Sequence, residues 1–289
     1  KYGITVPAED GVLGRLEEPD EEELEDSFLR YAGDVKASRK EATAYHLSGT
    51  PEPDGFKNLV TLMVPADALR SCAREYGVTV TELLAAAMMQ AIDRLQAEKE
   101  PRRSRRKPVK VLIPVNLRNL FPTRTLRNFA SYITPEIDPR MGDFTFREIC
   151  AAVHHRMGLE NNPHTMQAKF AANVASERSP VLRVMPLFVK NLAMKLVFDA
   201  VGERKSCLCL SNLGNVRLPE AMAPYVRRMD FIIGVQAKAA APHGCAVVSW
   251  NGTAYINCIR NIREPELELH FYQVLHELGL PVKAESNQR

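Results

Sequence analysis

Two short apolar segments, residues 245–251 and 253–259, meet at the dipeptide Asn251-Gly252. This pair is the strongest short signal for a two-residue β-hairpin, because both central positions of a type I′ turn need a positive φ. The sequence therefore predicts an antiparallel hairpin near the end of the chain, and a purely helical fold is excluded.

The clearest helix is predicted over residues 79–99. Thr79 and Glu82 have the spacing of a capping box, which marks the start of a helix. Leu84 and Met88 begin an apolar stripe that continues at helical spacing. A stripe of this kind is typical of a helix packed in a core, so no cofactor site is assigned to it.

The remaining elements follow from hydrophobic periodicity and from the positions of Gly and Pro. Strands are predicted over residues 44–47, 59–64, 109–117, 128–137, 207–211 and 229–235, and helices over 67–76, 144–157, 165–177, 181–201 and 265–278. The order is mixed and shows no regular strand–helix alternation, which argues against a Rossmann sheet. We expect an α/β (α+β) fold, a two-layer sandwich with a mixed β-sheet.

The chain of 289 residues is expected to divide unequally. Residues 1–42 are predicted to form an acidic linker and docking segment, in which Phe28 and Tyr31 attach to the body. Residues 43–289 are expected to form the folded lobe. The net charge of +3 does not indicate a nucleic-acid-binding protein.

Six cysteines occur without a Cys-x-x-Cys pair. We interpret them as reduced, mostly buried thiols of a cytoplasmic protein, and no metal site is expected. No signal-peptide pattern opens the sequence. The basic run at residues 102–107 is predicted to be a solvated loop, with contact to phosphates or to the CoA nucleotide as the alternative.

The most apolar stretch covers residues 180–201. Arg183, Lys190, Lys195 and Asp199 interrupt it, so a membrane span is not predicted. Three alternatives stay open for this segment. It can pack in the core, line an apolar acyl tunnel, or rest as a basic amphipathic helix on a membrane surface.

No complete catalytic constellation is visible in the sequence. The pair His154-His155 falls late in a predicted helix, where adjacent side chains point about 100° apart and do not easily share a metal. A surface or capping role is expected for the pair. His243 precedes a glycine in a loop and has no supporting residues nearby. Nucleophile-elbow, P-loop, Gly-x-Gly-x-x-Gly and zinc-protease patterns do not occur.

Polar residues at predicted strand ends are the better candidates, because sites are often built where a strand passes into a turn. Asn and Ser side chains there can donate hydrogen bonds to a developing oxyanion, and Arg can pair with a carboxylate or a phosphate. The alternative is that they satisfy backbone groups. The candidate residues are Asn116, Arg118, Asn128, Ser211, Asn212 and Gly214.

These positions carry a resemblance. The sequence VNLR at residues 115–118, followed by Asn128, is similar to the VNLR…N signature of condensation domains and related CoA-dependent acyltransferases. The sequence SNLG at residues 211–214 resembles a turn of the same superfamily, and the hairpin with its closing helix matches how such chains finish. The resemblance covers residues 40–282 and is nearest to bacterial alcohol acetyltransferase-like proteins.

The resemblance implies a chloramphenicol acetyltransferase-like fold of two similar lobes with a channel between them. Catalysis in this superfamily uses His-His-x-x-x-Asp-Gly, in which the second histidine is the general base. This sequence lacks the motif, because His154-His155 is followed by Arg-Met-Gly-Leu-Glu. We therefore expect a C-terminal lobe without a catalytic residue of its own, whose N-terminal lobe lies upstream.

The implied reaction moves an acyl group from acyl-CoA, as co-substrate, to an alcohol or glycolipid hydroxyl, with no bound cofactor. By resemblance, Ser211 and Asn212 would line the channel near the acyl carbonyl, with Gly214 allowing the turn. The three polar residues of the earlier motif would support the channel wall. The alternatives are a non-catalytic binding module that kept the fold and a condensation domain acting on carrier-protein thioesters.

Overall fold

The computed structural model describes Gly3 and residues 18–35, 42–178, 184–197, 205–235 and 242–288. Its strands form one sheet. They are β1 (Asn58–Pro65), β2 (Val109–Asn116), β3 (Ala130–Ile133), β4 (Glu136–Ile137), β5 (Leu208–Asn215), β6 (His243–Trp250), β7 (Thr253–Arg260) and β8 (Lys283–Ser286).

The sheet is mixed, as predicted. Its order is β3-β2-β5-β6-β7-β1-β8, and β4 also pairs with β2. The pairs β2–β5 and β5–β6 are parallel, whereas the other pairs are antiparallel. Parallel strands need a crossover connection, and the long helical segment between β4 and β5 supplies one of them.

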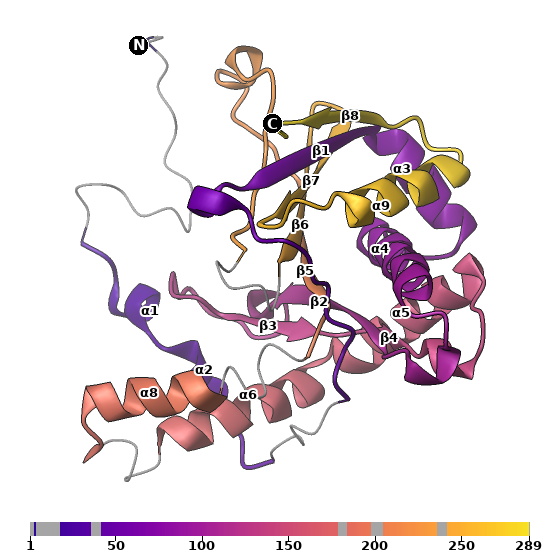
Figure 1. Cartoon of the computed structure of the whole chain (residues 1–289). Helices are drawn as coiled ribbons and strands as arrows, with labels where there is room; N and C mark the ends of the chain where they lie inside the picture. Colours follow the sequence, from indigo (N-terminus) through magenta and orange to yellow (C-terminus); the bar gives the residue numbers. More distant parts are fainter. Residues whose placement is uncertain are drawn as a thin grey trace.

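Helices cover one face of this sheet (Figure 1). They are α3 (Ala66–Glu75), α4 (Val80–Lys99), α5 (Phe146–Glu160) and α9 (Glu266–Glu277), with α1 (Glu21–Leu24), α2 (Ser27–Tyr31), α6 (Pro163–Glu177) and α8 (Leu187–Val197) placed further out. The central helix α4 contacts α3, α5, α9 and β2. None of the helices described is long and apolar enough to cross a membrane.

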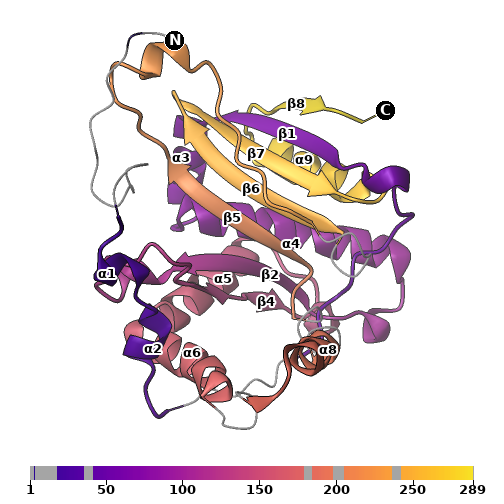
Figure 2. The same ribbon diagram turned by 90° about the vertical axis from the view of Figure 1, so that its left-hand side faces the viewer.

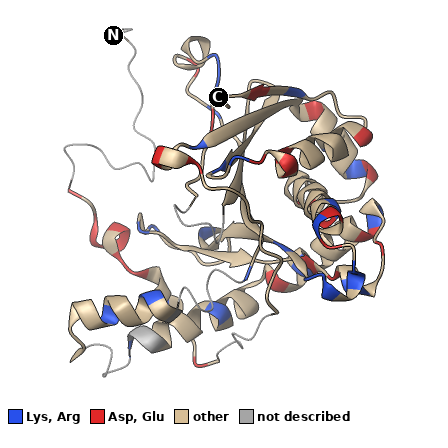
Figure 3. Ribbon diagram, in the orientation of Figure 1, with Lys and Arg blue, Asp and Glu red and all other residues tan. Residues whose placement is uncertain are grey.

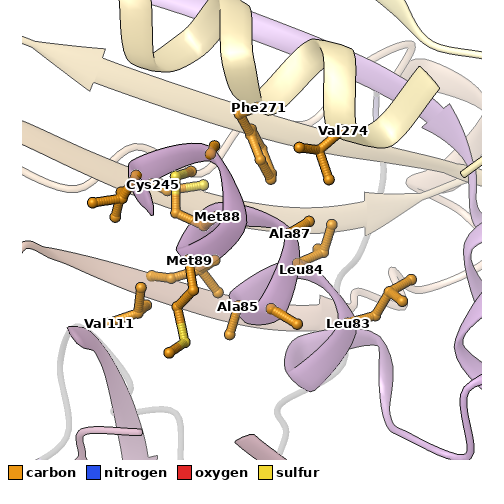
Figure 4. Packing of buried hydrophobic residues seen from close by; sticks show 14 of the residues in the cluster. Leu83, Leu84, Ala85, Ala87, Met88, Met89, Val111, Cys245, Phe271 and Val274 are labelled. Carbon is orange, nitrogen blue, oxygen red and sulfur yellow. The ribbon is translucent and has the colours of Figure 1, made fainter. Parts of the chain in front are cut away.

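The main core is built around α4. Its residues Leu83 to Met89 are all buried, and three of them are alanines that let neighbouring elements approach closely. In Figure 4, Phe271 and Val274 of α9 lie on one side of α4 and Val111 of β2 lies on the other. Each fully buried leucine or phenylalanine contributes about 1.5–3 kcal/mol by leaving water.

The predicted start of α4 is confirmed. The Thr79 hydroxyl accepts a hydrogen bond from the Glu82 backbone N–H at 3.3 Å, and the Glu82 carboxylate accepts one from the Thr79 N–H at 2.7 Å. The predicted hairpin is confirmed too. Asn251 and Gly252 have φ values of 47° and 78°, both positive as a type I′ turn requires.

A second, smaller core is aromatic. Phe28 of α2 packs against Phe129 and Phe170 at centroid distances of 4.9 and 5.5 Å, and Tyr31 lies 5.0 Å from Phe121. The docking of Phe28 and Tyr31 expected from the sequence is therefore present. Residues 1–17 of the predicted linker, other than Gly3, lie outside the described part of the chain, as do residues 36–41.

Two predicted strands are wrong. Residues 44–47 run extended through the core, where Tyr45 N–H donates to the Pro108 carbonyl at 2.8 Å without forming a ladder. Residues 229–235 lie across the face of β6. The Ile233 side chain packs over Gly244 so closely that a Cβ built on this glycine would lie 3.2 Å from it. Met229, Phe231, Ile233 and Val235 are half-buried by packing on a sheet face rather than by pairing in the ladder.

Several other elements also differ from the prediction. The strand predicted over residues 128–137 is interrupted between β3 and β4 at Pro135, which lacks a backbone N–H for the ladder. Strand β8 was not predicted, because its four residues are all exposed and show no apolar alternation. Of the helix predicted over residues 181–201, α8 covers Leu187–Val197, while residues 181–183 and 198–201 lie outside the described residues.

Candidate functional site

The two motif segments lie toward the carboxyl ends of two parallel strands of the sheet. β2 and β5 are parallel neighbours that pair only where Val111 and Leu112 face Leu208 and Cys209; beyond this point their carboxyl ends diverge (Figure 2). Asn116 ends β2, and residues 211–214 run from the middle of β5 toward its end. The carboxyl edge of parallel strands is where α/β sheets commonly build ligand sites.

Asn128 joins this edge through β3. The antiparallel pairing places Asn116 opposite Ala130, so Asn128 lies just before β3 and close to the end of β2. The six candidate residues are thus drawn from the ends of neighbouring strands. We call Asn116, Arg118, Asn128, Ser211, Asn212 and Gly214 the strand-end cluster.

Asn212 is held by protein partners at both ends of its amide. Its Nδ2 donates to Thr81 Oγ1 at 2.9 Å, and its Oδ1 accepts from the Gly214 backbone N–H at 2.9 Å. The first bond ties β5 to the first turn of α4, and the second closes the turn. Asn212 therefore sets the position of this strand end.

Gly214 supplies the backbone conformation of the same turn. Its φ is +82°, in the left-handed region that a side chain disfavours. The pairing of β5 with β6 is interrupted between Asn212 and Asn215, which lets the strand bend here. A Cβ at position 214 would meet no heavy atom within 4 Å, so the constraint is conformational rather than steric.

Ser211 faces away from the helical layer. Leu208 and Leu210 point into the main core and Asn212 reaches α4, so the alternation of a strand turns Cys209 and Ser211 to the opposite face. Both are half-buried. Burial raises the pKa of the Cys209 thiol to about 11, so this cysteine is not a thiolate nucleophile near neutral pH.

Arg118 closes the loop between β2 and β3. Its Nη2 donates to the Thr125 carbonyl at 2.8 Å and to the Arg127 carbonyl at 2.5 Å, and its backbone N–H donates to Asn116 Oδ1 at 3.1 Å. Asn128 is exposed beside this loop. Arg118 thus shapes the wall next to the strand ends through backbone carbonyls.

Sequence reasoning did not find Thr81. It lies 131 positions before Asn212 along the chain, in the capping region of a helix, and nothing in its local pattern indicates a contact with β5. His154, by contrast, has the predicted surface or capping role. Its Nδ1 lies 3.2 Å from the Glu82 carboxylate, which links α5 to the start of α4.

A buried polar group at the opposite end of β5 was also missed. His243 begins β6, and its Nε2 lies 3.9 Å from Glu268 of α9, while Arg260 of β7 donates to the same carboxylate at 3.1 Å. The Glu268 carboxylate by itself would favour a charged His243, but the charge of Arg260 already balances that carboxylate. Burial, reinforced by Arg260, lowers the pKa of His243 to about 3. His243 is therefore a neutral core residue, separate from the strand-end cluster.

Two surface cavities lie away from the cluster. One, of about 470 Å³, is bordered by Glu52, Asp54 and Arg263, and the other, of about 380 Å³, by Met63 and Tyr255 among others. Neither is lined by a residue of the strand-end cluster. Across the described residues, no group of three or more His, Cys, Asp or Glu side chains is arranged to hold a metal ion.

No protein-family model and no curated protein matches the sequence. Solved structures do match the fold. Trichothecene 15-O-acetyltransferase from Fusarium sporotrichioides superposes with a TM-score of 0.54 at 12% identity, over 81% of this chain and 49% of that chain. The nonribosomal peptide synthetase FmoA3 superposes with a TM-score of 0.53 at 17% identity, over 82% of this chain and 23% of that chain.

At these identities the likeness concerns the fold. This chain has the fold of the CoA-dependent acyltransferase superfamily, and the fold class predicted from its motifs is confirmed. The match spans about half the length of the acetyltransferase and about a quarter of the synthetase.

Proposed function

We propose that this chain is one lobe of an acyltransferase that moves an acyl group from CoA to an alcohol or glycolipid hydroxyl. The observation that carries the proposal is that residues 115–118 and 211–214 lie toward the carboxyl ends of the parallel strands β2 and β5. The fold shared with an acetyltransferase supports acyl transfer as the reaction class. A second lobe of the same protein would supply the catalytic histidine motif.

In this proposal Ser211 is the group that touches substrate. Its side chain faces away from α4, and its hydroxyl can donate a hydrogen bond to the acyl carbonyl oxygen as that oxygen becomes negative. Asn212 and Gly214 are positioning residues, because they hold the strand end that carries Ser211. Arg118 and Asn116 support the adjoining wall.

The proposed reaction is a thioester-to-ester exchange. A histidine of the second lobe takes the proton of the acceptor hydroxyl, and the oxygen forms a bond to the thioester carbonyl carbon. The tetrahedral oxyanion then collapses, the carbon–sulfur bond breaks, and the CoA thiolate takes the proton back from the histidine. Burial lowers the pKa of His243 to about 3, so this histidine is too weak a base for the step.

The test is an assay of the full-length gene product for release of the CoA thiol from acyl-CoA, with alcohols as acceptors. Ser211→Ala is expected to lower kcat about 10- to 100-fold, because one oxyanion donor is lost. Ser71→Ala, on the solvent side of α3, is the control and should leave kcat unchanged. A full-length protein that carries the histidine motif but neither cleaves nor binds acyl-CoA would refute the proposal.

A condensation domain is the second candidate, favoured by the superposition on a nonribosomal peptide synthetase. It predicts that the thioester is consumed when it is presented on a carrier protein and not when it is presented on CoA. Running both donors in the same assay separates the two. If the full-length protein lacks the His-His-x-x-x-Asp-Gly motif and consumes neither donor, a non-catalytic binding module remains.

A further inference from the structure

A surface cleft of about 380 Å³ opens where β7, β1 and β8 run side by side (Figure 2). Its volume is in the range of small-molecule sites, about 300–1,000 Å³. Most of the lining is apolar, and Met63, Pro281 and Val282 belong to it. Among the described residues that line the cleft, only Lys283 carries a charge at neutral pH. The cleft therefore combines an apolar body with a single cationic group.

The strand register places three of the lining residues in one row across the sheet. Met63 of β1 is opposite Tyr255 of β7 on one side and opposite Lys283 of β8 on the other. Directly opposed residues share a face of a sheet, so the row passes from an aromatic ring through a thioether to an ammonium group. With neighbouring strands about 4.8 Å apart, the two ends of the row are about 10 Å apart.

The charged groups near this row leave Lys283 without an acidic partner. Figure 3 shows both a basic and an acidic segment along β8. The acidic residue, Glu285, is bonded to Arg228 at 2.5 Å, and Arg228 also pairs with Asp230 at 2.6 Å. Within the part of the chain that the structure describes, no carboxylate lies within ion-pair distance of Lys283. The Lys283 ammonium group is therefore available to pair with an anionic ligand.

We propose that this cleft binds a small amphipathic carboxylate. The apolar tail of the ligand would lie along Met63 and Val282, and its carboxylate would pair with the Lys283 ammonium group. An apolar cleft alone would accept any hydrophobic molecule of suitable size, so the lysine is the group that selects an anion. The proposal does not depend on acyl transfer, because β6 and β7 lie between β5, which carries part of the strand-end cluster, and β1.

The experiment is a titration of the full-length protein, labelled with carbon-13 in its methionine methyl groups, with octanoate. The NMR signal of Met63, assigned through Met63→Leu, is expected to shift. The signal of Met141, which is 80% exposed and lies outside the cleft, is expected to stay in place. From butanoate through hexanoate to octanoate, the affinity should rise about threefold per methylene, because each one leaves water in the apolar part of the cleft.

The charge of the ligand is tested with octylamine, which is a cation at neutral pH. The wild-type protein should bind octanoate about fivefold more tightly than octylamine, and Lys283→Glu should reverse this preference. Lys107→Glu, at an exposed lysine outside the cleft, is the matched control and should leave the preference unchanged.

Three outcomes would overturn the proposal. The first is equal binding of octanoate and octylamine by the wild-type protein. The second is octanoate binding that leaves the Met63 signal unmoved, because the ligand would then occupy another site. The third is an absence of octanoate binding, which would follow if another part of the full-length protein filled the cleft.

Discussion

The side-chain amide of Asn212 donates a hydrogen bond to the hydroxyl of Thr81 at 2.9 Å, and so joins the end of β5 to the first turn of α4. The same asparagine accepts a hydrogen bond from Gly214 through its Oδ1. One side chain thus connects the turn, the sheet and the helical layer. The position of Ser211 depends on this connection, because it is the residue directly before Asn212.

Asn212→Ala is expected to lower the free energy of unfolding by about 2 kcal/mol, because two hydrogen bonds of about 1 kcal/mol each are lost. Thr81→Ala removes one of the two and should cost about 1 kcal/mol. Urea unfolding of both single variants and of the double variant measures the coupling. Additive effects would show that the Asn212–Thr81 bond contributes nothing.

Arg118→Lys is expected to loosen the loop between β2 and β3, because an ammonium group does not reproduce the forked contacts to the Thr125 and Arg127 carbonyls. Amide hydrogen exchange within residues 119–128 should accelerate. Arg124→Lys, at an arginine whose side chain is mostly exposed, is the control. Equal exchange in the two variants would contradict the role of Arg118.

The stability of the protein is expected to fall on the acid side of pH 6.5 because of His243. Its folded pKa, about 3, lies below the ordinary histidine value of 6.5, so the unfolded state takes up the proton first. The resulting loss is at most about 1.4 kcal/mol per pH unit between 6.5 and 3.

The comparison variant is His243→Gln, which does not titrate. Burial raises the pKa of Glu268, and this opposes the trend, but it is common to both proteins. The difference between wild type and variant, measured by urea unfolding at several pH values, isolates the histidine. Parallel pH profiles would mean that His243 is protonated to the same extent in both states.

Gly252→Ala is expected to destabilise the hairpin by about 1–2 kcal/mol, because φ at this position is +78° and a Cβ strains the left-handed backbone. Asn251→Gly keeps the positive φ of its position without strain and should preserve stability. Thermal unfolding of the two variants provides the measurement. A tolerated alanine would imply that the turn relaxes to another type.

Local patterns in the sequence determined the elements whose signals are self-contained. The capping box of Thr79 and Glu82, the Asn251-Gly252 turn and the strand over β2 each depend on residues a few positions apart, and all three are present. The strands predicted over residues 44–47 and 229–235 are absent, because no local signal distinguishes pairing in a ladder from packing without pairing. Apolar residues indicate burial, and burial is satisfied equally well by packing on a sheet face.

The motifs of the strand-end cluster were visible in the sequence, and their place on two parallel strands of one sheet was not. That placement comes from the parallel pairing of β2 with β5, which are separated in the sequence by residues 117–207, with β3 and β4 among them. The hydrogen-bond partners of Asn212 and the burial of His243 also depend on contacts between elements far apart in the sequence. Hydrogen bonding and desolvation depend on which surfaces meet in space, and only the packing of α4 and α9 against the sheet decides that for residues so distant along the chain.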